Sequence, residues 1–155
     1  MEQISVDAVV ENINIVTDFV NEQLERYGCP MKAQMQIDIA IDELFGNIAH
    51  YAYSPEIGPA TVCVEVTDRM DPGSEPEQEL DGKMIGKAGS LAVIITFIDH
   101  GVPYDPLSGA DPDVTLSAEE RDIGGLGIYM VKKSMDEIFY EYKEGRNILR
   151  VKKHF

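Results

Sequence analysis

The sequence predicts an α+β fold of two layers, in which helices cover one face of a mixed, mostly antiparallel sheet. Three observations predict it: two amphipathic helical segments come first, two pairs of strand-like segments follow, and one short helix separates the pairs. This order lacks the regular alternation of strands and helices that builds a parallel doubly wound sheet. With 155 residues, the chain fits a single domain over 1–155.

The first half of the chain carries the two long helical segments. Apolar residues recur at three- and four-residue steps over 9–24, and this pattern ends at the turn-forming residues of 28–30. A second pattern of the same period runs over 31–52. Before both helices, the residues of 4–6 alternate briefly, which predicts an edge strand.

Four strands and one short helix are expected after residue 60. Residues 61–67 alternate with β-branched side chains, and the continuous apolar run 91–98 predicts a central strand buried on both faces. A short helix is expected from the glycines of 124–127 to about residue 135. The segments 138–142 and 147–152 then form a hairpin around a Glu-Gly turn.

Two stretches lack a periodic pattern. Residues 68–90 are rich in proline, glycine and charge, which predicts a mobile hairpin excursion between two strands. A second irregular stretch spans 99–123.

Charge and composition exclude several classes of partner. The net charge of −15 argues against binding to nucleic acid, which requires clustered lysine and arginine, and equally against an anionic membrane surface. No apolar run reaches the ~20 residues of a membrane helix, and the polar start lacks a secretion signal, so a cytoplasmic location is expected. Cys29 and Cys63 fit no metal or redox spacing and are expected to be buried free thiols.

Glu43 and Asn47 are a candidate pair on the second helix. Four residues apart, they stack on one face at the edge of the apolar stripe. The carboxylate can accept a proton, and the amide can offer an uncharged oxygen to a cation such as Mg²⁺. The alternative, a solvated helix surface, is left open by this pair alone.

Asp99 ends the buried strand and is followed closely by Gly101. A carboxylate at this place can accept a hydrogen bond from an exocyclic amine such as that of adenine, and glycine lets a flat base approach the backbone. An Asx turn that ends the strand explains the same residues without a ligand.

Three glycines in four positions form the strongest single element. Gly124, Gly125 and Gly127, with Leu126 between them, precede an apolar helix and expose successive N–H groups at its positive end. Such a helix start binds phosphate; a flexible loop end is the alternative.

Taken together, three segments in this order carry a family resemblance. They are Glu43-Leu44-Phe45-Gly46-Asn47, Asp99-His100-Gly101-Val102-Pro103-Tyr104-Asp105-Pro106 and Gly124-Gly125-Leu126-Gly127-Ile128-Tyr129-Met130-Val131-Lys132. They resemble the N, G1 and G2 boxes of the GHKL ATPase and kinase superfamily, and within it the stand-alone anti-sigma regulatory serine/threonine kinases. The resemblance covers almost the whole chain and implies the Bergerat-type α/β sandwich.

The resemblance implies ATP and Mg²⁺ as cofactors and a role for each site residue. Asn47 would hold Mg²⁺ against the triphosphate, Asp99 would bind adenine with Gly101 beside the ring, and the glycines would hold phosphates. Residues 105–123 would form a lid over them, in which Arg121 compensates phosphate charge or is simply solvated. Glu43 would be the general base of a protein serine/threonine kinase.

The partners implied are a small anti-sigma factor antagonist as substrate and a sigma factor that the kinase sequesters. Homodimers are common among these kinases, but the sequence leaves both the monomer and the homodimer open. Three alternatives stay open: a nucleotide-gated binding module without kinase activity, a histidine-kinase catalytic domain or Hsp90/MutL-like ATPase, and a domain that has lost ATP binding.

Overall fold

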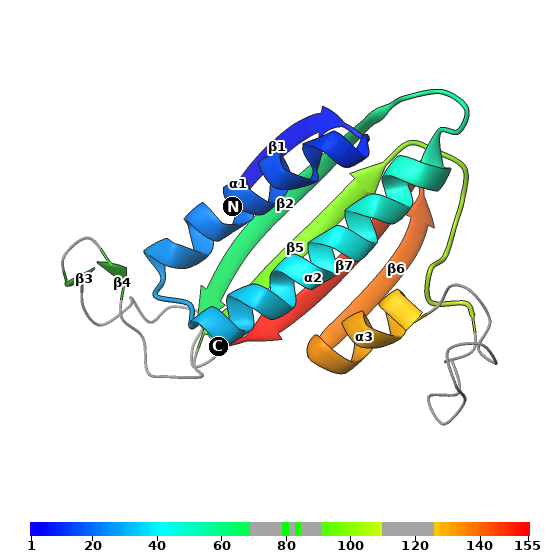
Figure 1. Ribbon diagram of the computed structural model, residues 1–155. Coiled ribbons are helices and arrows are strands. Elements are labelled where there is room, and N and C mark those ends of the chain that lie inside the picture. The colour runs from blue at the N-terminus through cyan, green and yellow to red at the C-terminus, as the bar shows by residue number, and fades with distance from the viewer. Residues whose placement is uncertain (69–78, 81–82, 85–90, 110–125) are drawn as a thin grey trace.

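The computed structural model describes residues 1–68, 79–80, 83–84, 91–109 and 126–155. Its two layers are a five-stranded sheet and three helices that all lie on one face of that sheet (Figure 1). The strands are β1 (Glu2–Asp7), β2 (Pro59–Asp68), β5 (Leu91–Asp99), β6 (Glu137–Lys143) and β7 (Arg146–His154). The helices are α1 (Ile13–Arg26), α2 (Met31–Asn47) and α3 (Leu126–Ser134). The predicted two-layer α+β class is confirmed.

Every neighbouring pair in the five-stranded sheet is antiparallel, in the order β1-β2-β5-β7-β6. The predicted mixed sheet therefore has no parallel pair among these five strands. The predicted edge strand over 4–6 is β1, which pairs only with β2. The hairpin between β6 and β7 turns at Glu144 and Gly145, which both have positive φ (55° and 76°), as a tight two-residue turn requires.

The core lies between the sheet and the helices. The largest fully buried side chains come from both layers, among them Phe45 and Ile41 of α2 and Phe97 and Ile95 of β5. Apolar residues of α3 complete this core: Ile128 and Val131 are buried. The helical periods read from the sequence therefore mark the faces that pack on the sheet.

The expectation that 91–98 is buried on both faces is wrong in part. Within β5, Val93, Ile95 and Phe97 are fully buried under the helices, whereas Ile94 and Ile98 on the opposite face are only half-buried. No described helix covers that opposite face (Figure 1). An antiparallel sheet can leave one face to solvent, and a strand at its centre is shielded there by its two neighbours rather than by a second layer.

Four short elements complete the description of the described residues. The turn η1 (Val10–Asn12) precedes α1, and the single π-helical turn η2 (Ile48–Ala52) continues α2. In the excursion predicted over 68–90, β3 (Glu79–Leu80) and β4 (Lys83–Met84) pair antiparallel; its other residues beyond Asp68 lie outside the described residues. Among the described helices, none is long and apolar enough to cross a membrane.

Candidate functional site

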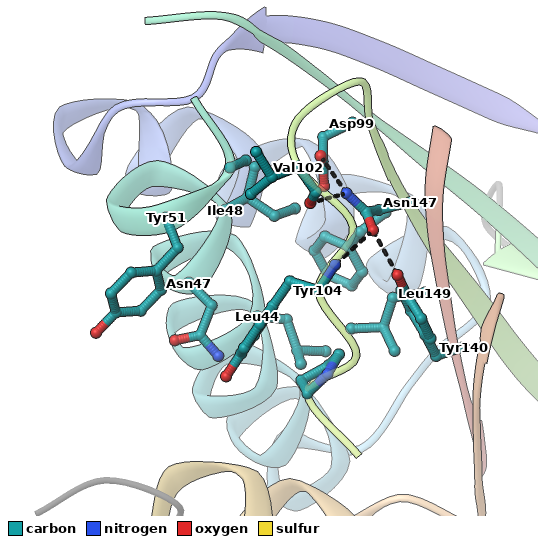
Figure 2. Close-up of a pocket in the computed structure, with 13 residues that line it drawn as sticks. Leu44, Asn47, Ile48, Tyr51, Asp99, Val102, Tyr104, Tyr140, Asn147 and Leu149 are labelled. Carbon is teal, nitrogen blue, oxygen red and sulfur yellow. Dashed lines mark hydrogen bonds between the residues drawn. The ribbon is translucent and has the colours of Figure 1, made fainter. Parts of the chain in front are cut away.

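A hollow opens between the end of α2, the segment that follows β5, and strands β6 and β7 (Figure 2). It contains about 430 Å³ of empty space, which includes open solvent. Apolar side chains dominate the lining, with two polar residues, Asp99 and Asn147, buried at its base. The lining residues are Leu44, Asn47, Ile48, Tyr51, Ala52, Phe97, Asp99, Val102, Tyr104, Pro106, Tyr140, Asn147 and Leu149.

The carboxylate of Asp99 is the acidic group of this hollow. Asp99 is buried, with only 4% of its surface exposed. Oδ1 accepts hydrogen bonds from the backbone N–H of Gly101 and from Nδ2 of Asn147, both at 2.9 Å. The first of these bonds is the Asx turn that the sequence offered as an alternative. Oδ2 has no hydrogen-bond partner among the described residues, so it can accept a hydrogen bond from an N–H or O–H group of a ligand.

The side chain of Asn147 organises the base of the hollow through four hydrogen bonds (Figure 2). Nδ2 donates to Asp99 and to the carbonyl oxygen of Val102 at 2.9 Å each. Oδ1 accepts from the backbone N–H of Tyr104 at 3.1 Å and from the Tyr140 hydroxyl at 2.5 Å. One amide therefore ties the end of β5, the following loop and β6 to β7.

Sequence reasoning did not assign a site role to Asn147 or to the tyrosines around the hollow. A signal existed for Asn147, because strand alternation places it on the same face as Leu149 and Val151, and a polar residue on a core face needs partners. Nothing comparable marks Tyr104 and Tyr140, because their positions follow from how the loop and β6 meet β7.

Gly101 is required here by packing. A Cβ added to it would overlap the backbone carbonyl of Ala52, whose oxygen also accepts a 3.0 Å hydrogen bond from the N–H of Val102. The glycine therefore lets the segment after β5 pass close to η2. It does not line the hollow, and its predicted place beside an adenine ring stays a prediction.

Glu43 and Asn47 lie on the α2 face that turns toward α3, and both are half-buried. Nδ2 of Asn47 is 3.4 Å from Oε1 of Glu43, a long hydrogen bond that joins the two side chains along one turn of helix. The Glu43 carboxylate also fills the space in which a Cβ of Gly127 would stand. The structure therefore brings together a carboxylate, an amide and the start of α3, from two segments far apart in sequence.

The start of α3 has a favourable electrostatic relation to Glu43. The first N–H groups of a helix lack intrahelical partners and carry a partial positive charge, so a carboxylate beside them is stabilised by roughly 0.3–1 kcal/mol. Leu126 opens the helix and is 41% exposed, and Gly127 follows it. The same N–H groups are the type that binds phosphate in other helices.

Nearly the whole chain corresponds to a known family. Residues 6–153 match the family model described as the histidine kinase-like ATPase domain. The chain belongs to this family. A search of curated proteins found no match.

Membership makes this chain an ATP-binding module of the GHKL superfamily, and the hollow fits the adenine end of that nucleotide. Its apolar lining, which includes Leu44, Phe97 and Leu149, suits a flat aromatic ring. The free Oδ2 of Asp99 is an acceptor for an amine group in an otherwise apolar site. That adenine binds to Asp99 stays a prediction.

A cation would depend on the nucleotide for most of its ligands. Within the described ranges, no three His, Cys, Asp or Glu side chains are grouped so as to hold a metal. Oδ1 of Asn47 has no protein partner in the described part of the chain and could provide one oxygen. This pattern suits Mg²⁺, which keeps several waters and commonly shares phosphate oxygens.

Three of the predicted phosphate-site residues, Arg121, Gly124 and Gly125, lie outside the described residues, as does the predicted lid beyond residue 109. The described beginning of that segment is a turn: Oδ1 of Asp105 accepts a 2.8 Å hydrogen bond from the N–H of Leu107. The predicted roles of these residues therefore stay predictions.

Proposed function

We propose that this ATP-binding domain is a serine/threonine protein kinase that phosphorylates an anti-sigma factor antagonist and sequesters a sigma factor. The resemblance of its three motifs to those of anti-sigma regulatory kinases supports the class of partner. One observation carries the kinase activity: the Glu43 carboxylate lies against Gly127 at the start of α3 and beside Asn47. A group able to accept a proton thus lies next to a helix start able to hold phosphate.

In the proposed reaction, a serine or threonine hydroxyl oxygen of the partner bonds to the γ-phosphorus while the bond between that phosphorus and the bridging oxygen of ADP breaks. Glu43 accepts the hydroxyl proton and later releases it to water. ATP supplies the phosphoryl group, and ADP leaves. The chain's own contribution is to orient the base and to hold the nucleotide at Asp99 and at the start of α3.

Electrostatics explains why a cation belongs in this proposal. The triphosphate and the Glu43 carboxylate are both negative, and the whole chain carries −15. Without a cation, the base would repel the phosphates that it must approach. Mg²⁺ bound by the Asn47 oxygen, phosphate oxygens and water would offset this repulsion.

A thermal unfolding series with Mg-ATP tests the nucleotide site. Ligand at about a hundred times its Kd stabilises a domain by about 2.7 kcal/mol, so the melting temperature should rise. Asp99→Asn should abolish the rise while keeping the fold, because the amide retains an acceptor oxygen for Gly101 and Asn147 but puts a donor where Oδ2 stood. Asp7→Asn, the same change on the exposed strand β1, is the matched control. If the parent chain shows no rise, the domain has lost ATP binding.

Phosphoryl transfer from γ-labelled ATP to proteins that co-purify with the chain tests the catalytic assignment. Glu43→Gln should slow transfer by about 100- to 10,000-fold, the range of general base catalysis, while Mg-ATP affinity stays near that of the parent. Transfer at the parental rate would show that Glu43 is not the base. A parent chain that binds its partner more tightly with ATP but transfers no phosphoryl group would instead be a nucleotide-gated binding module.

A further inference from the structure

A row of exposed apolar side chains runs along α2 toward the candidate base. Met31, Met35 and Ile39 are 70%, 57% and 52% exposed. They are spaced four residues apart, and the same row continues to Glu43 and Asn47. Each step of four residues also turns by about 40° around the helix axis, so the row crosses the exposed side of α2 obliquely on its way to Glu43. The core-facing side of α2 is packed on the sheet, whereas Met31, Met35 and Ile39 stay exposed in the described part of the chain.

Helix α3 extends the exposed apolar area. It packs beside α2 (Figure 1), and its Leu126 and Met130 are 41% and 50% exposed. We call the five residues Met31, Met35, Ile39, Leu126 and Met130 the α2–α3 apolar surface. Glu43 and Gly127 lie where its two helices meet.

The composition of this surface is that of a protein-binding site. Apolar side chains that gather on one exposed area mark interaction sites more often than scattered ones do. Methionine is flexible and polarisable, and it is used where one surface must fit partner side chains of varied shape.

Carboxylates border the α2–α3 apolar surface on the side of α1. Asp38 accepts a 3.0 Å hydrogen bond from Nδ2 of Asn21. Burial raises the pKa of the Asp38 carboxyl, and the negative charges of Asp42 and Asp18 add to that rise against the effect of the Asn21 bond. We call Asp18, Asp38 and Asp42 the acidic edge. None of the three forms an ion pair within the described residues.

We propose that the α2–α3 apolar surface docks an amphipathic helix of the phosphoacceptor protein, with lysine or arginine side chains of that helix along the acidic edge. The inference rests on the proposed kinase function, because an acceptor hydroxyl that reaches Glu43 must come from a protein covering the surface next to it. A helix fits because side chains one turn apart on the partner match the one-turn spacing of Met31, Met35 and Ile39. A basic flank fits because it brings opposite charge to carboxylates that now repel one another.

Three labelled peptides of about five helical turns provide the probe. They share one leucine face and differ only in the flanking residues, which are lysine, serine or glutamate. We expect the lysine peptide to bind most tightly and the glutamate peptide least, as measured by fluorescence anisotropy. Equal affinities for the lysine and glutamate peptides would overturn the charge part of the proposal.

Paired variants locate the binding site. Met35→Ser combined with Ile39→Ser should weaken lysine-peptide binding by about tenfold or more, as loss of central apolar contacts does at other interfaces. Ile15→Ser, which removes a similarly exposed apolar side chain from α1 (48% exposed), should not. If the first variant binds like the parent, the peptide adheres only through net charge and the docking surface is wrong.

The acidic edge is tested by charge removal without a change of shape. Asp38→Asn with Asp42→Asn should abolish the preference for the lysine peptide over the serine peptide. Glu11→Gln with Glu25→Gln removes the same charge from exposed positions near and on α1, and should keep that preference. Analytical sedimentation of the parent chain tests whether a second copy of this chain occupies the surface instead. If the parent self-associates and Met35→Ser with Ile39→Ser abolishes this, the surface is an interface between copies of the chain and the proposal is overturned.

Failure of this inference is distinguishable from failure of the proposed function. The peptide measurements need neither ATP nor catalysis. In the transfer assay, Met35→Ser with Ile39→Ser should raise the KM for the protein substrate and leave the KM for ATP unchanged. An unchanged KM for the protein substrate would overturn the docking surface while the kinase assignment stands.

Discussion

Asn147 shows how a single residue can decide the shape of a site. Its amide uses both hydrogens and both lone pairs, and its four partners come from β5, the loop after it and β6. One of these partners is the buried carboxylate of Asp99, and hydrogen bonds to charged groups contribute about 1.5–3 kcal/mol each. We therefore assign Asn147 as the residue that positions Asp99.

Replacing Asn147 with leucine should lower the free energy of unfolding by about 1–3 kcal/mol, because the buried carboxylate of Asp99 and the part-buried backbone groups of Tyr104 and Val102 each lose a partner. The Mg-ATP thermal shift should shrink as well, since the carboxylate is no longer held in place. Tyr140→Phe removes only one of the four bonds and should cost less. Urea denaturation measures the difference, and parental stability of Asn147→Leu would contradict the network.

Two glycines should respond in opposite directions to the same substitution. A Cβ added to Gly46, inside α2, meets no atom within 4 Å, so Gly46→Ala should stabilise the fold by about 0.5–1 kcal/mol through helix propensity. A Cβ added to Gly101 overlaps the backbone of Ala52. Gly101→Ala should therefore destabilise by about 1–3 kcal/mol, the usual cost of overpacking. Thermal unfolding of both variants checks the pair, and equal signs would contradict it.

Among secondary-structure elements, α2 and α3 are the pair that assembles the proposed catalytic site. The Glu43-to-Asn47 spacing puts both side chains on one line of α2, which sequence alone indicates. That α3 lies against this line, with Gly127 under the carboxylate, depends on how the two helices pack on the sheet. The element η2, a π-helical turn directly after Asn47, extends α2 into the hollow through Tyr51 and Ala52.

Substitution of Gly127 by alanine should slow phosphoryl transfer without a matching loss of thermal stability. The three atoms nearest to the new Cβ all belong to the flexible end of Glu43, which can move, so the melting temperature should change little. The displaced carboxylate should slow phosphoryl transfer by up to about 100-fold, since a misplacement near 1 Å can have that effect. Ser134→Ala, at the other end of α3, should leave transfer unchanged. Parental transfer by Gly127→Ala would place the working position of Glu43 elsewhere.

At the scale of the whole molecule, burial of a thiol links stability to pH. Cys29 follows α1 at the turn to α2 and is 6% exposed. Burial raises its pKa from 9.0 to about 11, although the positive charge of Lys153 opposes the rise. Burial also raises the pKa of Cys63. Both cysteines are free and buried, as the sequence predicts.

The sign of the pH effect follows from this raised pKa. The folded state keeps the Cys29 thiol neutral, so its contribution is complete below pH 9.0 and is lost as pH rises through about 11. The free energy of unfolding of the parent should fall as pH rises across that interval. The free energy of unfolding of Cys29→Ala should fall less steeply. Denaturation at both ends of the interval measures the two slopes. Identical slopes would show that other groups govern the alkaline transition.

The sequence by itself determined the layers, the order of elements and most element boundaries, because periods of 3.6 and 2 residues reflect local geometry and burial on one face. It also predicted which motifs hold a nucleotide, and that assignment stays a prediction. The partners of Asp99, the packing reason for Gly101 and the contact of Glu43 with Gly127 came only from the tertiary structure, because each joins residues that are far apart in sequence or belong to separate elements. Only the tertiary structure showed that the face of β5 opposite the helices is half-exposed. A continuous apolar run in a strand indicates that its side chains are largely removed from water. Whether helices or the side chains of neighbouring strands cover them depends on which face of the sheet the helices pack against.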